Sequence, residues 1–276
     1  MSSTILDLLS FGRKKLKQVT SNYKQESVWM LSKVMKIDSS DLLTFDQKVN
    51  KNKHDLFLKL ITRRLNNEPL QYILESIYFY GYKFKIHNSV FIPRQETEVC
   101  IDILKNKATI YHNTLEVGCG LGCISITLVL EKICKNIDSI DVNNFAIKAA
   151  QDNAFDLGCK SINFFQQNFF DIDYKKKYDL IVSNPPYIPI SEIKDLDLEV
   201  KLHDPLQALT DYSDGLKFYK YLSVIGKDML NDDGIICLEF GGEKQKTSII
   251  KIFEEQGFRT QIFCDLNKDP RFIVAS

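Results

Sequence analysis

Apolar residues recur at helical spacing through the first part of the chain. They stand three or four positions apart in three series, Ile5, Leu8, Leu9, then Val28, Leu31, Val34, Met35, and then Leu56, Leu60, Ile61, Leu65. Because an α-helix has about 3.6 residues per turn, this spacing gathers the apolar side chains on one face. The pattern therefore predicts a small helical domain over residues 1–75.

The pattern changes between residues 76 and 92. Aromatic and β-branched residues partly alternate with polar ones around Gly81, and His87-Asn88-Ser89 supplies turn-forming side chains before Pro93. Aromatic and β-branched residues favour strands, whereas Gly, Pro and Asn mark where strands end. We expect a β-hairpin linker over 76–92.

From residue 93 onward, predicted strands and helices alternate. Strands are predicted over 114–117, 137–142, 162–165, 179–183, 235–240, 258–263 and 271–275. Helical spacing occupies 122–135, 144–157, 216–230 and 243–256. This alternation predicts an α/β domain over 93–276 with a doubly wound, mostly parallel sheet. Since no helix separates the last two strands, we expect them to pair antiparallel at the sheet edge.

Charge and cysteine content narrow the class of protein. Lysine plus arginine equals aspartate plus glutamate at 36 each, whereas a nucleic-acid binder usually has a basic excess. No run approaches the roughly 20 apolar residues of a membrane span, and the first apolar stretch precedes its charges, unlike a signal peptide. Seven cysteines without a C-x-x-C pair indicate reduced thiols rather than a zinc or disulfide framework. We expect a cytoplasmic protein with no metal site, no membrane segment and no stable nucleic-acid partner.

The predicted helical domain is locally basic, and two interpretations of its charge stay open. Its basic residues include Arg13, Lys14, Lys15, Lys17, Lys48, Lys51, Lys53, Lys59, Arg63 and Arg64. They either form solvated helix faces or provide a docking surface for a macromolecular partner.

A glycine-rich segment, Glu116-Val117-Gly118-Cys119-Gly120-Leu121-Gly122, joins a predicted strand to a predicted helix. Glycine lets the backbone turn tightly and approach a ligand closely. The spacing differs from the dinucleotide fingerprint G-x-G-x-x-G, and no Lys-Ser pair follows as in a P-loop. The segment resembles motif I of S-adenosylmethionine methyltransferases. That resemblance implies that Gly118, Cys119, Gly120, Leu121 and Gly122 bind S-adenosylmethionine.

Two further positions complete the expected cofactor site. Asp141 ends the next predicted strand, where a carboxylate can accept hydrogen bonds from both ribose hydroxyls. The alternative is a turn or helix-capping aspartate, although Asn143 or Asn144 can cap instead. Phe169 follows the third predicted strand, at a position that contacts adenine in methyltransferases. Its alternative role is that of an ordinary core aromatic residue.

Asn184-Pro185-Pro186-Tyr187 directly follows an apolar predicted strand. The prolines lock φ and remove two donors, which leaves rigid carbonyl acceptors beside the Asn184 side-chain carbonyl. Together these acceptors can grip both N–H bonds of an NH₂ group, and Tyr187 can pack against a planar amide or base. Asn184 therefore belongs to both the expected substrate site and the expected cofactor site. The chemistry needs positioning rather than a titratable catalytic pair.

N-P-P-Y occurs in adenine-N6 methyltransferases and in glutamine-N5 methyltransferases, and other segments choose between them. These segments are 67–73, Phe91-Ile92-Pro93-Arg94-Gln95-Glu96-Thr97-Glu98, Asp204-Pro205-Leu206-Gln207-Ala208-Leu209, Asp214-Gly215-Leu216, Leu238-Glu239-Phe240-Gly241 and 265–271. In order and over nearly the whole chain, they resemble the PrmC/HemK family of bacterial release factor glutamine methyltransferases. Asn67, Gln95, Asn168 and Phe169 depart from residues found in that family.

The resemblance implies a fold, a reaction and a partner. The fold is a Rossmann-like class I methyltransferase sheet with an antiparallel last strand, a small N-terminal helical domain and a hairpin linker. The reaction converts S-adenosylmethionine to S-adenosylhomocysteine while methylating the glutamine of the Gly-Gly-Gln motif in peptide chain release factors. We expect a monomer whose 1–75 domain docks this substrate. Arg94 and Glu96 either bind the substrate or order the linker, and Glu239 either lines the pocket or ends a strand.

Overall fold

The computed structural model describes residues 3–42, 44, 46–171 and 175–276. The chain divides into two compact units. The first comprises Met1–Ile77 and Leu198–His203, and the second comprises Tyr78–Asp197 and Asp204–Ser276. The short segment Leu198–His203 thus belongs with the helical unit, although the sequence pattern places it within the predicted domain 93–276.

The first unit is built from helices that bury their apolar faces against one another. They are α1 (Ile5–Leu16), α2 (Tyr23–Met35), α3 (Ser39–Leu42), α4 (Lys51–Leu65), α5 (Leu70–Leu74) and α9 (Leu198–His203). The three predicted apolar series supply α1, α2 and α4, and Leu31, Phe57 and Ile61 lie in their shared core. The helical interpretation of this part is therefore confirmed. Within the described residues, no helix is both long enough and apolar enough to span a membrane.

A buried arginine ties α9 to the rest of the first unit. The Nε of Arg64 donates to Glu26 at 2.8 Å, and its Nη1 donates to Glu199 at 2.9 Å. Arg64 and Glu26 are both buried, and a buried charge is tolerated only when it is paired and hydrogen-bonded. Glu199 therefore completes the pairing of a charge from the helical unit.

The expected hairpin forms a two-stranded sheet of β1 (Ser76–Phe79) and β2 (Tyr82–Lys85). A seven-stranded sheet follows, in the order β5-β4-β3-β6-β7-β9-β8. Its strands are β3 (Tyr111–Val117), β4 (Cys134–Asp141), β5 (Ile162–Gln166), β6 (Tyr178–Ser183), β7 (Leu230–Glu239), β8 (Thr260–Cys264) and β9 (Pro270–Ala275). Neighbours from β5 to β7 pair in parallel, and β9 pairs antiparallel with both β7 and β8. The mostly parallel sheet with an antiparallel last strand is confirmed.

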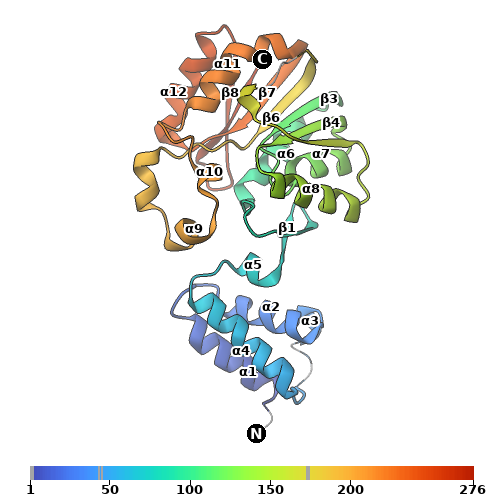
Figure 1. The fold of residues 1–276 in the computed structure, drawn as a ribbon, viewed down its shortest axis with the longest axis vertical. Coiled ribbons are helices and arrows are strands. Elements are labelled where there is room, and N and C mark those ends of the chain that lie inside the picture. The colour runs from blue at the N-terminus through green and yellow to red at the C-terminus, as the bar shows by residue number, and fades with distance from the viewer. Residues whose placement is uncertain (1–2, 43, 45, 172–174) are drawn as a thin grey trace. The chain divides into compact units, whose positions relative to one another are not determined.

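Helices cover both faces of this sheet. The helical segments of the second unit are η1 (Gln95–Glu98), α6 (Val99–Asn106), α7 (Cys123–Leu130), α8 (Asn144–Asp156), η2 (Phe169–Asp171), η3 (Ile190–Asp195), α10 (Leu206–Leu209), α11 (Lys217–Met229) and α12 (Glu243–Glu254). Figure 1 shows α6, α7 and α8 on one face and α11 and α12 on the other. Tyr219, Leu222 and Phe253 of the latter pair are buried against apolar strand residues. This packing leaves the carboxyl ends of the parallel strands to build a site.

The prediction of one helix over 122–135 is wrong at its C-terminal end. α7 ends at Leu130, Lys132 adopts a left-handed φ of 59°, and β4 begins at Cys134. Ile133 and Cys134 are both buried at 4% exposure. Their apolar spacing continues the helical period although Cys134 already belongs to the strand, so periodicity alone misplaces the boundary.

Candidate active site

The glycine-rich segment forms a left-handed turn at the end of β3. Gly118, Gly120 and Gly122 have φ values of 76°, 54° and 79°, a region that side chains rarely adopt. A Cβ on Gly122 would lie 2.9 Å from Ile126 Cδ1 and 3.0 Å from Ala150 Cβ. Gly122 therefore allows the turn to pack against the helices behind it, whereas the residues from Gly118 to Leu121 line a pocket.

A pocket opens where β3, β4 and β6 end. Its lining includes most of the expected site residues, namely Gly118, Cys119, Gly120, Leu121, Asp141, Phe169, Asn184, Pro185 and Pro186. The two remaining expected site residues, Gly122 and Tyr187, are not among the described residues that line it. The carboxyl ends of parallel strands are where α/β folds bind ligands. The chain thus brings the expected cofactor residues and the expected substrate residues into one cavity.

Asp141 organises the glycine turn as well as lining the pocket. Its Oδ2 accepts the Gly120 N–H at 2.9 Å, and its Oδ1 accepts the Asn143 N–H at 2.8 Å. Asn143, not Asp141, caps α8, since its side chain accepts from the Phe145 N–H. A carboxylate has about four acceptor positions, so Asp141 keeps capacity for ligand hydroxyls. The ribose role stays a prediction, and beside it Asp141 has the turn role that the sequence left open, since it accepts from the Asn143 N–H two residues on.

Glu116 supplies a buried oxygen that suits a cationic ligand group. It is 1% exposed and lines the pocket, and its Oε2 accepts from Ser139 Oγ at 2.7 Å. Within the described part of the chain, its Oε1 has no hydrogen-bond partner. Burial raises the pKa of Glu116 to about 7. An unpaired buried carboxylate oxygen is costly unless a ligand satisfies it, and the ammonium of an amino-acid moiety would do so.

Phe169 lines the pocket and belongs to an aromatic cluster. Its ring stacks on Phe218 at 6.2 Å between centroids and meets Tyr221 edge-on at 5.2 Å. Both Phe169 and Phe218 line the pocket, together with Asn168. Phe169 is therefore a core aromatic that also presents surface to the cavity. Its contact with adenine stays a prediction.

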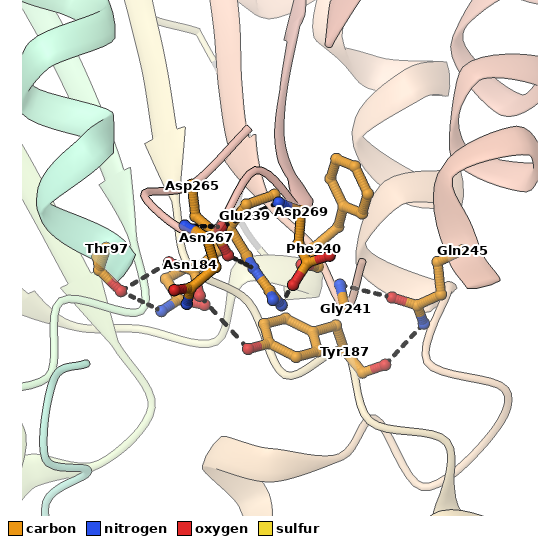
Figure 2. A network of polar contacts seen from close by, with 11 residues as sticks. Thr97, Asn184, Tyr187, Glu239, Phe240, Gly241, Gln245, Asp265, Asn267 and Asp269 are labelled. Carbon is orange, nitrogen blue, oxygen red and sulfur yellow. Dashed lines mark hydrogen bonds and ion pairs between the residues drawn. The ribbon is translucent and has the colours of Figure 1, made fainter. Parts of the chain in front are cut away.

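A polar network stands behind Asn184 and Tyr187 (Figure 2). Asn184 Nδ2 donates to Thr97 Oγ1 at 3.1 Å, and Thr97 Oγ1 contacts Glu239 Oε2 at 2.6 Å. The Tyr187 hydroxyl lies 3.4 Å from Glu239 Oε1. Glu239 thus ends β7, as one of its two expected roles has it, and it is a buried partner of these side chains that is absent from the described pocket lining.

The backbone of Tyr187 is held from its other side by residues far along the chain. Gln245 Nε2 donates to the Tyr187 carbonyl at 2.8 Å, and Gln245 Oε1 accepts from the Gly241 N–H at 2.9 Å. Gly215, with φ of 77°, lies so close that a Cβ would overlap the Tyr187 carbonyl oxygen. Sequence patterns indicated neither contact. Asp214-Gly215-Leu216 stood out in the sequence only as a segment that resembles the family.

We expect Gly215→Ala to lower the free energy of unfolding by more than the about 1–2 kcal/mol that left-handed backbone strain alone costs. The added Cβ must also displace Tyr187, so kcat should fall as well. Gly158→Ala is the matched control, because Gly158 has a φ of 73° with no atom within 4 Å of its would-be Cβ. Equal losses of stability in urea unfolding of the two variants would contradict the close approach to Tyr187.

Arg94 forms an ion pair within the second unit, so its guanidinium is already engaged by a protein carboxylate. Its Nη2 donates to Asp204 at 2.7 Å, and its guanidinium lies over the Phe91 ring at 5.3 Å. This arrangement favours the ordering role over substrate binding for Arg94.

Among the described residues, no group of three or more His, Cys, Asp or Glu side chains could hold a metal ion. The seven cysteines are free thiols, five of them buried.

Comparison with known proteins identifies relatives over the whole chain. Residues 7–74 match the family model PrmC N-terminal domain, and residues 82–200 match Methyltransferase small domain. The release factor glutamine methyltransferase of Fusobacterium nucleatum subsp. nucleatum is 35% identical over 91% of this chain and 72% of the relative. The enzyme of the same name from Geobacter sulfurreducens is 33% identical over 91% of this chain and 87% of the relative.

Solved structures support the fold. A methyltransferase from Pyrococcus furiosus superposes with a TM-score of 0.55 at 15% identity, covering 78% of this chain and 95% of that one. At that identity the likeness establishes the Rossmann-like fold alone. The sequence relatives carry the classification, because this chain matches them across both units. On these grounds, the chain belongs to the release factor glutamine methyltransferase family.

Proposed function

We propose that this chain transfers the methyl group of S-adenosylmethionine to the side-chain amide nitrogen, N5, of the glutamine in the Gly-Gly-Gln motif of release factors. The observation that carries the proposal is that the glycine turn and Asn184-Pro185-Pro186 line one pocket. Names of relatives supply the substrate class. Because release factors act in translation termination, we also propose that the enzyme is cytoplasmic. We propose separately that it is a monomer and that it does not bind nucleic acid stably.

The pocket residues fit the proposed cofactor. The unpaired Glu116 oxygen suits its ammonium group, and Asp141 suits its ribose. The turn at Gly118–Leu121 lets the cofactor approach the protein backbone closely. When bound, S-adenosylmethionine supplies an electrophilic methyl on sulfur and leaves as the neutral thioether S-adenosylhomocysteine. Its charge is lost in the reaction, so the protein has no leaving-group anion to stabilise.

The residues of the chain must instead prepare the nucleophile. An amide nitrogen is a weak nucleophile, because its lone pair is delocalised into its carbonyl. Acceptors on its two N–H bonds, from the Asn184 side chain and the backbone before Pro186, restore electron density and fix its direction. The nitrogen forms the new bond to carbon and releases one proton to water. Positioning therefore supplies most of the catalysis in this proposal.

Tritiated S-adenosylmethionine tests the proposal directly. The chain is incubated with a release factor, with the same factor carrying alanine in place of the Gly-Gly-Gln glutamine, and with DNA. We expect label in the first protein and none in its alanine version. Label in DNA and none in the release factor would overturn the proposal in favour of an adenine-N6 enzyme.

We further propose that the basic helical unit docks the release factor. Lys14, Lys15 and Lys17 are exposed on α1 or at its end, where an acidic partner surface could reach them. A docking role predicts a higher kcat/KM for intact release factor than for a short Gly-Gly-Gln peptide. Equal kcat/KM values for the two substrates would count against it.

A further inference from the structure

Three side chains from distant parts of the chain form a hydrogen-bonded relay at the substrate pocket, which Figure 2 shows at close range. Asn184 and Thr97 line the pocket, and Glu239 is absent from its described lining. Asn184 follows β6, Thr97 lies in η1 and Glu239 ends β7. The distances are 3.1 Å from Asn184 Nδ2 to Thr97 Oγ1 and 2.6 Å from Thr97 Oγ1 to Glu239 Oε2. Thr97 and Glu239 are only 2% and 1% exposed, so water does not compete for these bonds.

The proton count in this relay decides which way the Asn184 amide faces. A hydroxyl has one proton, and an ionised carboxylate can only accept. While Glu239 is ionised, Thr97 must give its proton to Glu239 and can only accept from Asn184. Asn184 must then turn its NH₂ end toward Thr97. The carbonyl oxygen of the same amide is held on the other side of the group, and Asn184 lines the pocket.

We propose that Thr97 and Glu239 are positioning residues for methyl transfer, which together fix the Asn184 amide so that its carbonyl oxygen accepts from the substrate NH₂ group. This inference rests on the proposed function, because it assigns the orientation of the acceptor which that reaction needs. An amide turned the other way would present NH₂ to NH₂. Two donors would then face each other, and the grip on the glutamine would be lost.

The orientation of the Asn184 amide depends on the charge of Glu239. Thr97 and Glu96 face it from η1, Tyr187 from the loop after β6, and Arg271 from β9. Cys100 of α6 and Tyr219 of α11 also lie close enough to interact with its charge. Burial raises the pKa of Glu239 to about 7, against the opposing effects of Thr97, Arg271 and Tyr187, while Glu96 adds to the rise. A protonated Glu239 can donate to Thr97, which frees the Thr97 proton for the Asn184 carbonyl and lets the amide turn over.

Thr97→Val and Thr97→Ser test the relay as a pair. Valine keeps the shape of threonine and removes the hydroxyl, so we expect kcat to fall by about 10- to 100-fold, as misorientation of a positioned group costs. KM for the release factor and affinity for S-adenosylmethionine should change little. Serine restores the hydroxyl and should restore most of the rate. A valine variant with wild-type kcat, or a serine variant no better than valine, would overturn the proposal.

A double-mutant cycle separates positioning from a general structural effect. If Thr97 acts through Asn184, then Thr97→Val should cost nothing further in an Asn184→Ala background. An equal loss in both backgrounds would show that Thr97 acts independently of Asn184.

In the wild type, kcat should fall as pH decreases through about 7, where Glu239 takes up a proton. Glu239→Gln cannot ionise, so it should have a lower plateau and lack this acid limb. These rates are measured at saturating S-adenosylmethionine, so that protonation of Glu116, whose pKa is also about 7, does not limit them through cofactor binding. An acid limb that persists in Glu239→Gln under those conditions would also overturn the proposal.

A spectroscopic measurement keeps this inference distinct from the proposed function. The ¹⁵N–¹H signals of the Asn184 side chain, assigned by their loss in Asn184→Ala, should show a hydrogen-bonded proton in the wild type that is absent in Thr97→Val. If the wild type fails to label release factor while this signature is present, the proposed function fails and the orientation stands. If labelling succeeds and the signature is unchanged by Thr97→Val, the relay is refuted.

Discussion

Replacing Asn184 by alanine is expected to lower kcat by about 10²- to 10³-fold, the usual cost of removing one hydrogen-bonding group aimed at a reacting centre. The substitution removes a side-chain acceptor that lines the pocket and leaves Thr97 without its Asn184 donor. Neither the glycine turn nor Asp141 is touched, so affinity for S-adenosylmethionine should change far less than kcat. Single-turnover methylation of a release factor and calorimetric titration of the cofactor measure the two quantities separately.

Asn168→Ala provides the matched control for this experiment. Asn168 is the same residue type and lines the same pocket, but it lies beside Phe169 at the proposed adenine end. We expect its removal to alter cofactor affinity modestly and to leave kcat at saturating cofactor near the wild-type value. Unchanged kcat in Asn184→Ala, or equal losses in the two variants, would contradict the proposed grip on the substrate amide.

The residues that could be found from sequence share a local signal. The glycine turn, Asp141 and Asn184 each directly follow or end a predicted strand. β6 and the last four residues of β3 are mostly buried, whereas β4 is marked by two buried isoleucines, Ile137 and Ile140, among polar residues. Parallel strands place their carboxyl ends together, so strand identity alone gathers these side chains at one edge. The fold class and the location of the pocket could be predicted because they depend on which residues are buried. The spacing of apolar residues in the sequence indicates those residues well.

The partners behind the pocket could not be found in this way. Thr97 and Glu239 are separated by 142 positions, and Gln245 and Tyr187 by 58. Such pairings depend on where a loop meets a strand end in three dimensions, which no local period encodes. The same limit explains Leu198–His203, whose place in the helical unit depends on the ion pair of Glu199 with Arg64. The sequence thus predicted Asn184 and Tyr187 as site residues but not the contacts that Thr97, Glu239 and Gln245 make with them.

Replacing Asp141 by alanine is expected to weaken S-adenosylmethionine binding by about 100-fold, since bonds to a charged group contribute about 1.5–3 kcal/mol each and tenfold in affinity is about 1.4 kcal/mol. Two losses combine in this variant. The proposed ribose hydroxyls lose their acceptor, and Gly120 loses the carboxylate that holds its N–H at 2.9 Å. Once the cofactor is saturating, kcat should recover toward the wild-type value, because Asn184 and its partners are unaffected.

Asp138→Ala distinguishes a local role of Asp141 from a general effect of removing a carboxylate from β4. Asp138 lies on the same strand, where it binds Lys176 at 2.6 Å and Asn163 at 3.0 Å, and it is absent from the described pocket lining. Its loss should leave cofactor affinity near that of the wild type. Equal weakening in both variants would place the effect in the strand rather than the site. Asp141→Asn separates the two losses further. One amide oxygen can still accept from Gly120 or from the ribose, so its affinity should lie between those of the wild type and the alanine variant.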